Sequence, residues 1–241
     1  LGVIIEGYVG IIGVYLMGVV MHAVGFCLIL MLRAPDNPPR QEKSRVFSEI
    51  ADGFRHIKTR EMLVATLVVT AIMNFFAMSF SSQLPAIAVE VLKLQTDQSS
   101  FLAGAEGLGA FIGAIFIASR QFTTPGRLFI FGSIMFELFI LAFSHAPILM
   151  LAVPLLILGG IGHAGFSASQ SALMIAYSDP SMRARAMGAI AVCIGTQPFG
   201  ILLLGLVAES HGAPVAIAIN ATLGILLLIW AGWRWPVLLR R

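Results

Sequence analysis

Long apolar runs separated by short polar segments dominate the pattern along the chain. A helix needs about 20 apolar residues to cross the roughly 30 Å hydrocarbon core of a bilayer. Runs of suitable length cover residues 12–32, 62–86, 99–119, 128–144, 148–177, 186–208 and 213–233. They are too long and too continuously apolar for the roughly ten-residue alternation of barrel strands. The pattern therefore predicts an all-α transmembrane fold with seven full spans.

The first eleven residues are also apolar and are interpreted as the tail of a further span. A single helix over 1–32 would be about 48 Å long, which is too long for one crossing. Four glycines make a break plausible: Gly2, Gly7, Gly10 and Gly13. The chain starts at Leu1 inside apolar sequence, with no charged n-region and no small-residue cleavage site. This start predicts no signal peptide and a preceding segment upstream.

Basic residues gather on one side of the predicted spans. Of the fifteen Lys and Arg residues, only Lys93 falls on the opposite side. The others are Arg33, Arg40, Lys43, Arg45, Arg55, Lys58, Arg60, Arg120, Arg127, Arg183, Arg185, Arg234, Arg240 and Arg241. Because cytoplasmic loops of membrane proteins carry an excess of Lys and Arg, this face is expected to be cytoplasmic, with the C-terminus inside.

Composition agrees with a membrane protein and excludes several other classes. The chain is 58% hydrophobic and 11% charged, whereas soluble domains have about 45–50% apolar and about 25% charged residues. An ordinary soluble enzyme, a disordered protein and a nucleic-acid binder are excluded. The net charge of +3 reflects topology rather than polyanion binding. Cys27 and Cys193 lie far apart in apolar stretches and indicate neither a disulfide framework nor a metal site.

Residues 34–61 form the one extended hydrophilic segment. Within it, Phe47, Ile50, Phe54 and Ile57 recur at helical spacing, with charged residues on the other face. One interpretation is an interfacial helix on the inner leaflet that links two membrane bundles. The alternative is a solvated loop whose apolar stripe packs on the bundle.

Three segments carry a resemblance to a known family. They are EIADGFRHIKTREMLVATLVV, GIGHAGFSASQSALMIAYSDPSMRARAMG and IGTQPFGILLLGLVAESHG. Together with the basic linker followed by six spans, they resemble the major facilitator superfamily of transporters, and within it the transmembrane secretion effectors, a branch that includes enterobactin exporters. In that branch a P-x-x-x-R-x-R-A-x-G-like stretch joins helices ten and eleven. Pro180, Arg183, Arg185, Ala186 and Gly188 fit this stretch.

The resemblance implies a division of the chain into three parts. Residues 1–33 would be the end of the N-terminal half (the tail of helix five and helix six), 34–61 the cytoplasmic linker, and 62–241 the C-terminal six-helix half. The remaining N-terminal half of the same transporter would then be a required partner. The resemblance also implies a small-molecule substrate and alternating access between the two halves.

The resemblance points to cytoplasmic gate loops at Arg120, Arg127, Asp179, Arg183 and Arg185. The superfamily's loop between helices eight and nine often reads G-x-x-x-D-R-x-G-R-R. The corresponding segment here, GAIFIASRQFTTPGRLF, keeps the glycines and arginines but lacks the Asp. The loop is therefore expected to lack the usual acid–base latch.

Two acidic residues lie inside predicted spans, where a charge costs at least roughly 2.5–3.5 kcal/mol. Glu106 shares a helical face with Gly109 and Gly113, a small-xxx-small pair typical of helix packing, so it is expected to face protein or a cavity. It is a candidate for proton or substrate binding, or else a structural carboxyl bonded to a neighbouring helix. Glu137 lies near the midplane among bulkier neighbours and is a second candidate.

Neutral polar residues suggest a substrate cavity in three spans. In one span, a helical face carries four polar residues and continues with two glycines: His163, Ser167, Gln170 and Ser171, then Gly159 and Gly160. This stripe is either the wall of a cavity or a set of hydrogen bonds between packed helices.

Asn74 lies near mid-depth in its span. Gln197 precedes Pro198, where a kink would leave a carbonyl uncapped. Each of these two is a candidate for the cavity or for packing.

The leading hypothesis is a proton-coupled exporter of small amphipathic molecules, drugs or siderophores, in the bacterial inner membrane. The chain has no Walker-type loop, no H-E-x-x-H and no G-x-S-x-G, so neither an ATP-driven pump, nor an intramembrane enzyme, nor a cofactor or metal site is expected. A non-transporting scaffold or sensor built on the same bundle is the alternative.

Overall fold

The structure is a computed structural model that describes residues 2–31, 57–95, 99–120 and 124–240. Within these ranges the chain is helical and contains no strand. It divides into two units, Leu1–Ser48 and Glu49–Arg241. The predicted linker falls mostly outside the described residues. Its described end begins at Ile57, which is buried in one hydrophobic cluster with Leu63, Leu67, Ala186 and Ile190.

The first unit contains the helix α1 (Gly2–Met31). Gly10 interrupts it with φ 67° and ψ 172°, a backbone conformation that a glycine adopts without the penalty of a Cβ. The kink lies close to the boundary at which the sequence predicts one span to end and the next to begin. Beyond it, Tyr15–Met31 is a shorter apolar helix whose larger side chains are mostly exposed.

The second unit contains six helical spans that are long and apolar enough to cross a membrane. They are Glu61–Val91, Ser100–Ser119, Pro125–Ser144, Leu149–Tyr177, Pro180–His211 and Ala213–Arg234. Four of them are essentially single helices, α5 (Ser100–Ser119), α6 (Pro125–Ser144), α7 (Leu149–Tyr177) and α10 (Ala213–Arg234). A short helix, α11 (Val237–Arg240), follows the last span. Each predicted span from residue 62 onward therefore has its counterpart.

Two spans are composite. The span Glu61–Val91 consists of α3 (Glu61–Ile72), the π-helical η1 (Met73–Ala77), the 3-10 helical η2 (Met78–Gln83), α4 (Leu84–Ala86) and the π-helical η3 (Ile87–Val91). The span Pro180–His211 consists of η5 (Pro180–Met182), α8 (Arg183–Ile194) and α9 (Gln197–His211). The break between α8 and α9 precedes Pro198, where proline cannot donate a backbone hydrogen bond.

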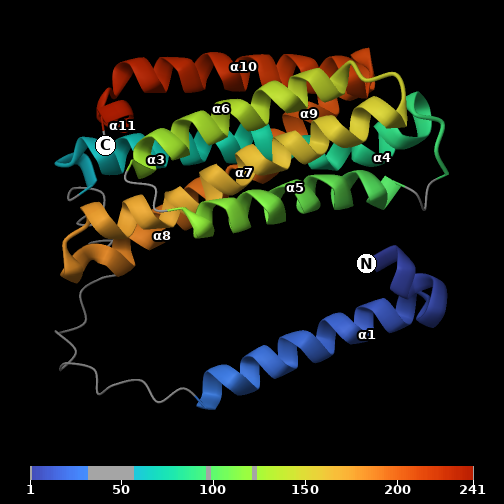
Figure 1. The fold of residues 1–241 in the computed structure, drawn as a ribbon, viewed down its shortest axis with the longest axis horizontal. Coiled ribbons are helices and arrows are strands. Elements are labelled where there is room, and N and C mark those ends of the chain that lie inside the picture. The colour runs from blue at the N-terminus through green and yellow to red at the C-terminus, as the bar shows by residue number, and fades with distance from the viewer. Residues whose placement is uncertain (1, 32–56, 96–98, 121–123, 241) are drawn as a thin grey trace. The chain divides into compact units, whose positions relative to one another are not determined.

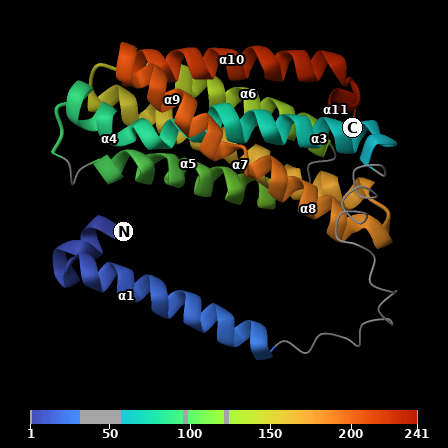
Figure 2. The same cartoon turned by 180° about the vertical axis from the view of Figure 1, so that it is seen from behind.

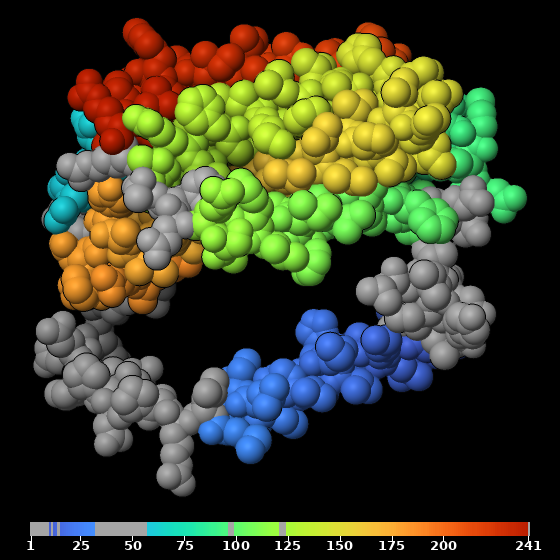
Figure 3. Space-filling view, viewed as in Figure 1, coloured from blue at the N-terminus to red at the C-terminus, as the bar shows by residue number. Residues whose placement is uncertain are grey.

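Within the second unit, α7 is the central element. It packs closely against both α5 and α6, and its side chains lie between theirs on the face shown in Figure 3. Helices α5 and α10 lie at opposite edges of this unit in both ribbon views (Figures 1 and 2). The core includes an aromatic cluster in which Phe80 meets Phe136 and Phe143 edge-on. This packing holds the polar residues of the spans at defined positions.

Candidate functional site

Two ionisable side chains from different helices meet inside the second unit. The Oε1 of Glu106 on α5 lies 2.7 Å from the Nδ1 of His163 on α7. Glu106 lies about 9 Å from the start of α5 at Ser100, and His163 lies about 21 Å from either end of α7. Their side chains are 22% and 27% exposed, respectively. The two groups therefore form a partly accessible acid–base pair within the spans.

Glycines make this close approach of α5 and α7 possible. A Cβ added at Gly160 would lie 2.1 Å from the backbone oxygen of Glu106, and one at Gly109 would lie 1.9 Å from that of Ile157. At Gly113 an added Cβ would lie 2.8 Å from the Cβ of Ala164. Small residues that let backbones approach are typical of packed membrane helices. The predicted packing residues Gly109 and Gly113 thus face α7 and bring Glu106 to His163.

Two aromatic rings lie beside the histidine. The ring centroid of His163 lies 5.3 Å from that of Phe136 and 6.3 Å from that of Phe166. These contacts restrict the imidazole and leave its Nδ1 directed at Glu106. Either group can hold the proton of this hydrogen bond, because a neutral imidazole has one donor and one acceptor nitrogen.

The polar stripe predicted on α7 is divided among different surroundings. Gln170 is buried, and its Nε2 donates to the Oγ1 of Thr70 on α3 over 2.9 Å. Ser167 is exposed and bonds within its own helix. Gly159 and Gly160 pack against neighbouring helices. His163, Ser167 and Ser171 are at least partly exposed along the helix, whereas Gln170 connects α7 to α3.

Asn74 and Gln197 both contact the irregular part of the first span. Asn74 lies within η1, is buried, and donates from Nδ2 to the carbonyl of Thr70 over 2.9 Å. Gln197 donates from Nε2 to the carbonyl of Met78 over 3.4 Å. Thr196 donates to the carbonyl of Ala71 over 3.3 Å. These bonds satisfy carbonyls beside the π-helical and 3-10 segments and attach α9 to them.

Glu137 is separate from the Glu106–His163 pair. It is fully buried in α6, and neither carboxyl oxygen has a hydrogen-bond partner. A Cβ added at Gly224 of α10 would lie 2.0 Å from its Oε1. The glycine therefore provides the space that this carboxyl occupies.

The candidate gate residues lie at one end of the second unit, called here the basic end, which carries Arg60, Arg127, Arg183 and Arg240. Arg60, before α3, and Asp179, after α7, form an ion pair with 3.1 Å between Nη2 and Oδ1. The Nε of Arg127 donates to the carbonyl of Leu239 in α11. These contacts bring the starts of α3 and α6 together with the ends of α7 and α11, as alternating spans require.

The other gate candidates make local contacts at this end. The guanidinium of Arg120 lies 5.6 Å from the ring centroid of Phe116. Arg185 contacts the Sδ of Met182 from Nη1 over 3.5 Å. Arg183 is exposed at the start of α8. Residues 121–123 of the predicted latch loop lie outside the described residues.

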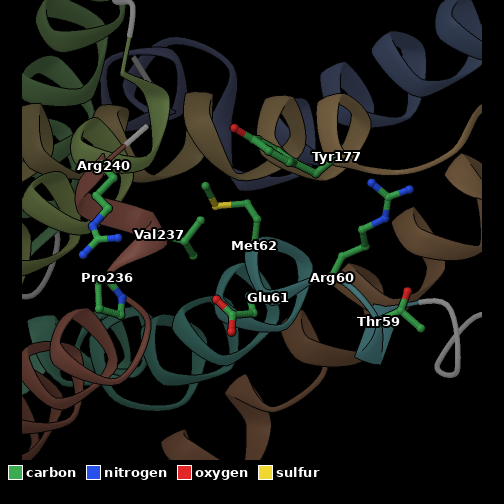
Figure 4. A pocket seen from close by; sticks show the side chains of 8 residues that line it. All are labelled: Thr59, Arg60, Glu61, Met62, Tyr177, Pro236, Val237 and Arg240. Carbon is green, nitrogen blue, oxygen red and sulfur yellow. The ribbon is translucent and has the colours of Figure 1, made fainter.

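A cavity of about 570 Å³ opens at the basic end (Figure 4). It is lined by Thr59, Arg60, Glu61, Met62, Tyr177, Pro236, Val237 and Arg240. In Figure 4 the side chains of Arg60 and Arg240 lie on opposite sides of the cavity, with Met62 and Val237 between them. The cavity lies far from the Glu106–His163 pair and joins the ends of three spans.

Sequence reasoning missed two of these features. The Arg60–Asp179 pair joins residues 119 positions apart, and neither residue carries a local signal for the other. Asn220 of α10 donates to the carbonyl of Phe76 in η1 over 2.7 Å. A polar residue inside an apolar span was the available signal for Asn220. Within the described residues, no group of three His, Cys, Asp or Glu is arranged to hold a metal ion.

Comparisons with known proteins agree with this architecture. The family model described as transmembrane secretion effector matches residues 1–238. A search of curated proteins finds no match. A crystal structure of a bacterial homolog to the human lysosomal transporter Spinster, in an inward-facing conformation, is similar with a TM-score of 0.55 and 14% identity.

That likeness covers 95% of this chain and 57% of the Spinster homolog, so the chain spans little more than half the length of the protein it matches. At this identity the likeness shows the fold alone, a helical transporter bundle. The family match extends along nearly the whole chain. The chain therefore belongs to the transmembrane secretion effectors of the major facilitator superfamily, a family of multi-pass membrane transporters, as the resemblance of its motifs predicts.

Proposed function

We propose that this chain is part of a secondary active transporter that exports small amphipathic molecules in exchange for protons. The observation that supports this proposal is the Glu106–His163 pair, because it is a partly exposed acid–base pair within two membrane-length spans. Ionisable residues within membrane spans are expensive and are typical of proton relays and substrate pathways in transporters.

The pair has three protonation states that differ stepwise by one charge, and a carboxylate beside a neutral imidazole carries one net negative charge. With one proton shared between the carboxyl and the imidazole, the pair is neutral overall, as a neutral acid beside a neutral base or as an ion pair. A second proton leaves a net positive charge on the pair. Uptake of that proton from one side of the membrane and its release to the other would couple export to the proton gradient, provided that access to the pair alternates.

The surroundings of the pair favour an amphipathic substrate. The rings of Phe136 and Phe166 lie beside His163, and the neighbouring face of α5 and α7 is rich in glycine. Sites with a few polar groups among apolar and aromatic side chains are typical of small-molecule binding. A proton acceptor among apolar groups suits a molecule with both apolar surface and a polar or cationic group.

The basic end is proposed to face the cytoplasm of a bacterium, with the protein in the inner membrane and the C-terminus inside. The excess of Lys and Arg in the loops at that end supports this orientation. Alternating access is proposed to require an N-terminal half of the same transporter, which agrees with the 57% share of the Spinster homolog that the chain covers. Helices in a C-terminal bundle would then rock against that half around the pair.

The test uses the transporter reconstituted in proteoliposomes with an imposed pH gradient and a panel of amphipathic dyes and siderophores. We expect Glu106→Gln to abolish gradient-driven transport while leaving the amount of folded protein unchanged, since the amide keeps the shape of the carboxyl but carries no exchangeable charge. Glu209→Gln, at an exposed acid near the end of α9, is the matched control and should transport like the wild type.

Two results would contradict the proposal. If Glu106→Gln transports with undiminished dependence on the pH gradient, the pair does not carry the coupling proton. If the wild type moves none of the compounds under any gradient, the scaffold or sensor alternative is favoured.

A further inference from the structure

Glu137 is an acidic residue that the Glu106–His163 pair does not use. Among the acidic side chains that the structure describes, it alone is fully buried, and neither of its oxygens has a hydrogen-bond partner. It lies about 18 Å along α6 from Pro125, which is near the middle of the span. A buried acid at this depth requires a physical explanation.

The side chain occupies a space bounded by three elements. Gly224 of α10 lies against the carboxyl, since a Cβ there would be 2.0 Å from Oε1. The same added Cβ would be 3.2 Å from the Cβ of Phe76 in η1. One turn earlier on α10, Asn220 donates to the carbonyl of Phe76. The carboxyl of Glu137 therefore lies where α6, α10 and the π-helical segment meet.

No cation in the neighbouring elements is placed to neutralise a carboxylate there. The first span has ionisable residues only at its ends, α10 has only Arg234, and α6 itself has only Arg127, each about 15 Å or more away along its helix. The ionisable groups on the helices packed against α6 are His163 and Tyr177 on α7, Arg234 on α10 and Arg240 on α11, and the span that contains η1 has Glu61 and Glu90 near its two ends. His163 is directed at Glu106 instead.

This environment disfavours the ionised carboxylate strongly. Removing an unpaired ion from water is strongly unfavourable even after relaxation of the protein, and a polar group without a hydrogen bond adds to that penalty. The carboxyl is therefore compatible with this packing only when it carries a proton. Ionisation, in which the O–H bond breaks and the proton passes to water, requires that water reach the oxygens.

We propose that Glu137 is a second proton-binding residue, protonated when α6, α10 and η1 are packed as in this structure and ionised when that packing opens. The inference deepens the proposed function and rests on it for the role of the proton in transport. The π-helical turn offers a route for opening. Such turns occur mostly as single-turn bulges inside α-helices and are frequent at functional sites, and a return of this one to α-helical geometry would move Phe76 and the bond from Asn220.

The first test detects the proton itself. Infrared spectroscopy of the purified protein in detergent resolves the carbonyl stretch of a protonated carboxyl, which shifts in D₂O and is absent from a carboxylate. We expect a band from a carboxyl without hydrogen bonds in the wild type and in Glu106→Gln, and its loss in Glu137→Gln. An unchanged band in Glu137→Gln would overturn the proposal.

The second test detects the coupled movement. The three tryptophans of the chain are Trp230, Trp233 and Trp235, in or directly after α10. Raising the pH removes the proton from Glu137 and favours the opened packing, so tryptophan emission should change with pH in the wild type and in Glu209→Gln. We expect no such transition in Glu137→Gln, while Glu106→Gln should retain it. The same pH curve in Glu137→Gln as in the wild type would overturn the coupling.

A second variant guards against loss of folding in Glu137→Gln. Gly224→Ala introduces a Cβ into the space of Oε1 and should displace the carboxyl into a more polar environment, which shifts the infrared band. A band at the wild-type position in Gly224→Ala would contradict the assigned location. Both measurements use neither substrate nor gradient, so they succeed or fail independently of the transport assay.

Discussion

At the scale of single residues, glycines decide where the helices of the second unit approach one another. Gly109 and Gly160 leave no room for a Cβ against the facing backbone, whereas Gly104 and Gly107 on the same helix α5 have nothing within 4 Å of the position of an added Cβ. The two kinds of glycine are alike in sequence. Only the first kind holds Glu106 within hydrogen-bond distance of His163.

This difference predicts the effect of a methyl group on stability. Gly109→Ala should destabilise the folded bundle by about 1–3 kcal/mol, because the added carbon overlaps the carbonyl of Ile157 and forces α5 away from α7. Gly107→Ala is the matched control and should be neutral or slightly stabilising, since alanine favours helix over glycine. Thermal unfolding of the purified variants in detergent measures both. Equal midpoints for the two variants would contradict the assigned packing.

At the scale of elements, the first span of the second unit combines regular and irregular helix. Its regular start, α3, is joined to α7 by the bond from Gln170 to Thr70. Its irregular middle receives bonds from α9 and α10 through Gln197 and Asn220. Irregular backbone within a membrane is tolerated where neighbouring helices satisfy the freed carbonyls. Gln197 and Asn220 therefore stabilise the π-helical and 3-10 segments of this span by donating to its carbonyls.

The bond between α3 and α7 can be measured by a double-mutant cycle. Gln170→Leu and Thr70→Val should each destabilise the protein, and the pair should show a coupling energy of about 0.6 kcal/mol, which is typical of hydrogen bonds between membrane helices. Ser167→Ala, at an exposed position one turn away, should show no coupling to Thr70→Val. Strictly additive effects of the Gln170 and Thr70 substitutions would mean that the bond does not contribute.

At the scale of the whole molecule, the basic end sets the expected orientation in the membrane. Ser181 and Ser210 are exposed and lie near opposite ends of the same span, Pro180–His211. In a background without Cys27 and Cys193, a membrane-impermeant maleimide added to intact cells should label Ser210→Cys and not Ser181→Cys. Lysed cells should label both, which controls for accessibility. The reverse pattern would place the basic end outside and contradict the proposed orientation.

Much of the fold follows from the sequence because span length and loop charge are local properties. The span predicted over 128–144 is observed as α6, and the one over 213–233 as α10. The break near Gln197 was readable from Pro198. The interruption of the first span by π-helical and 3-10 turns was not readable, since its residues form an ordinary apolar run whose geometry depends on contacts from α9 and α10.

The candidate site was only partly predictable. The sequence shows Glu106 as an acid on a face of small residues and His163 as a member of a polar stripe, but their pairing spans 57 positions. Glu137 was recognised as an acid at mid-depth, whereas its lack of any partner depends on which face of α6 meets Gly224. Pairing depends on helix rotation and neighbour choice, which periodicity alone leaves open.

By itself, the sequence determined that the chain is an all-α membrane protein, where most of its spans lie and which loops share a side. These three conclusions follow from two free-energy costs, that of exposing apolar side chains to water and that of placing charges in lipid. Each cost is a sum over individual residues, so it can be estimated along the chain without knowledge of the tertiary structure. Only the tertiary structure decided that Glu106 meets His163, that Gln170 binds α3 instead of facing open space, and that Glu137 is enclosed. Those outcomes depend on how closely two backbones approach, and at Gly109, Gly160 and Gly224 a single absent Cβ sets that distance.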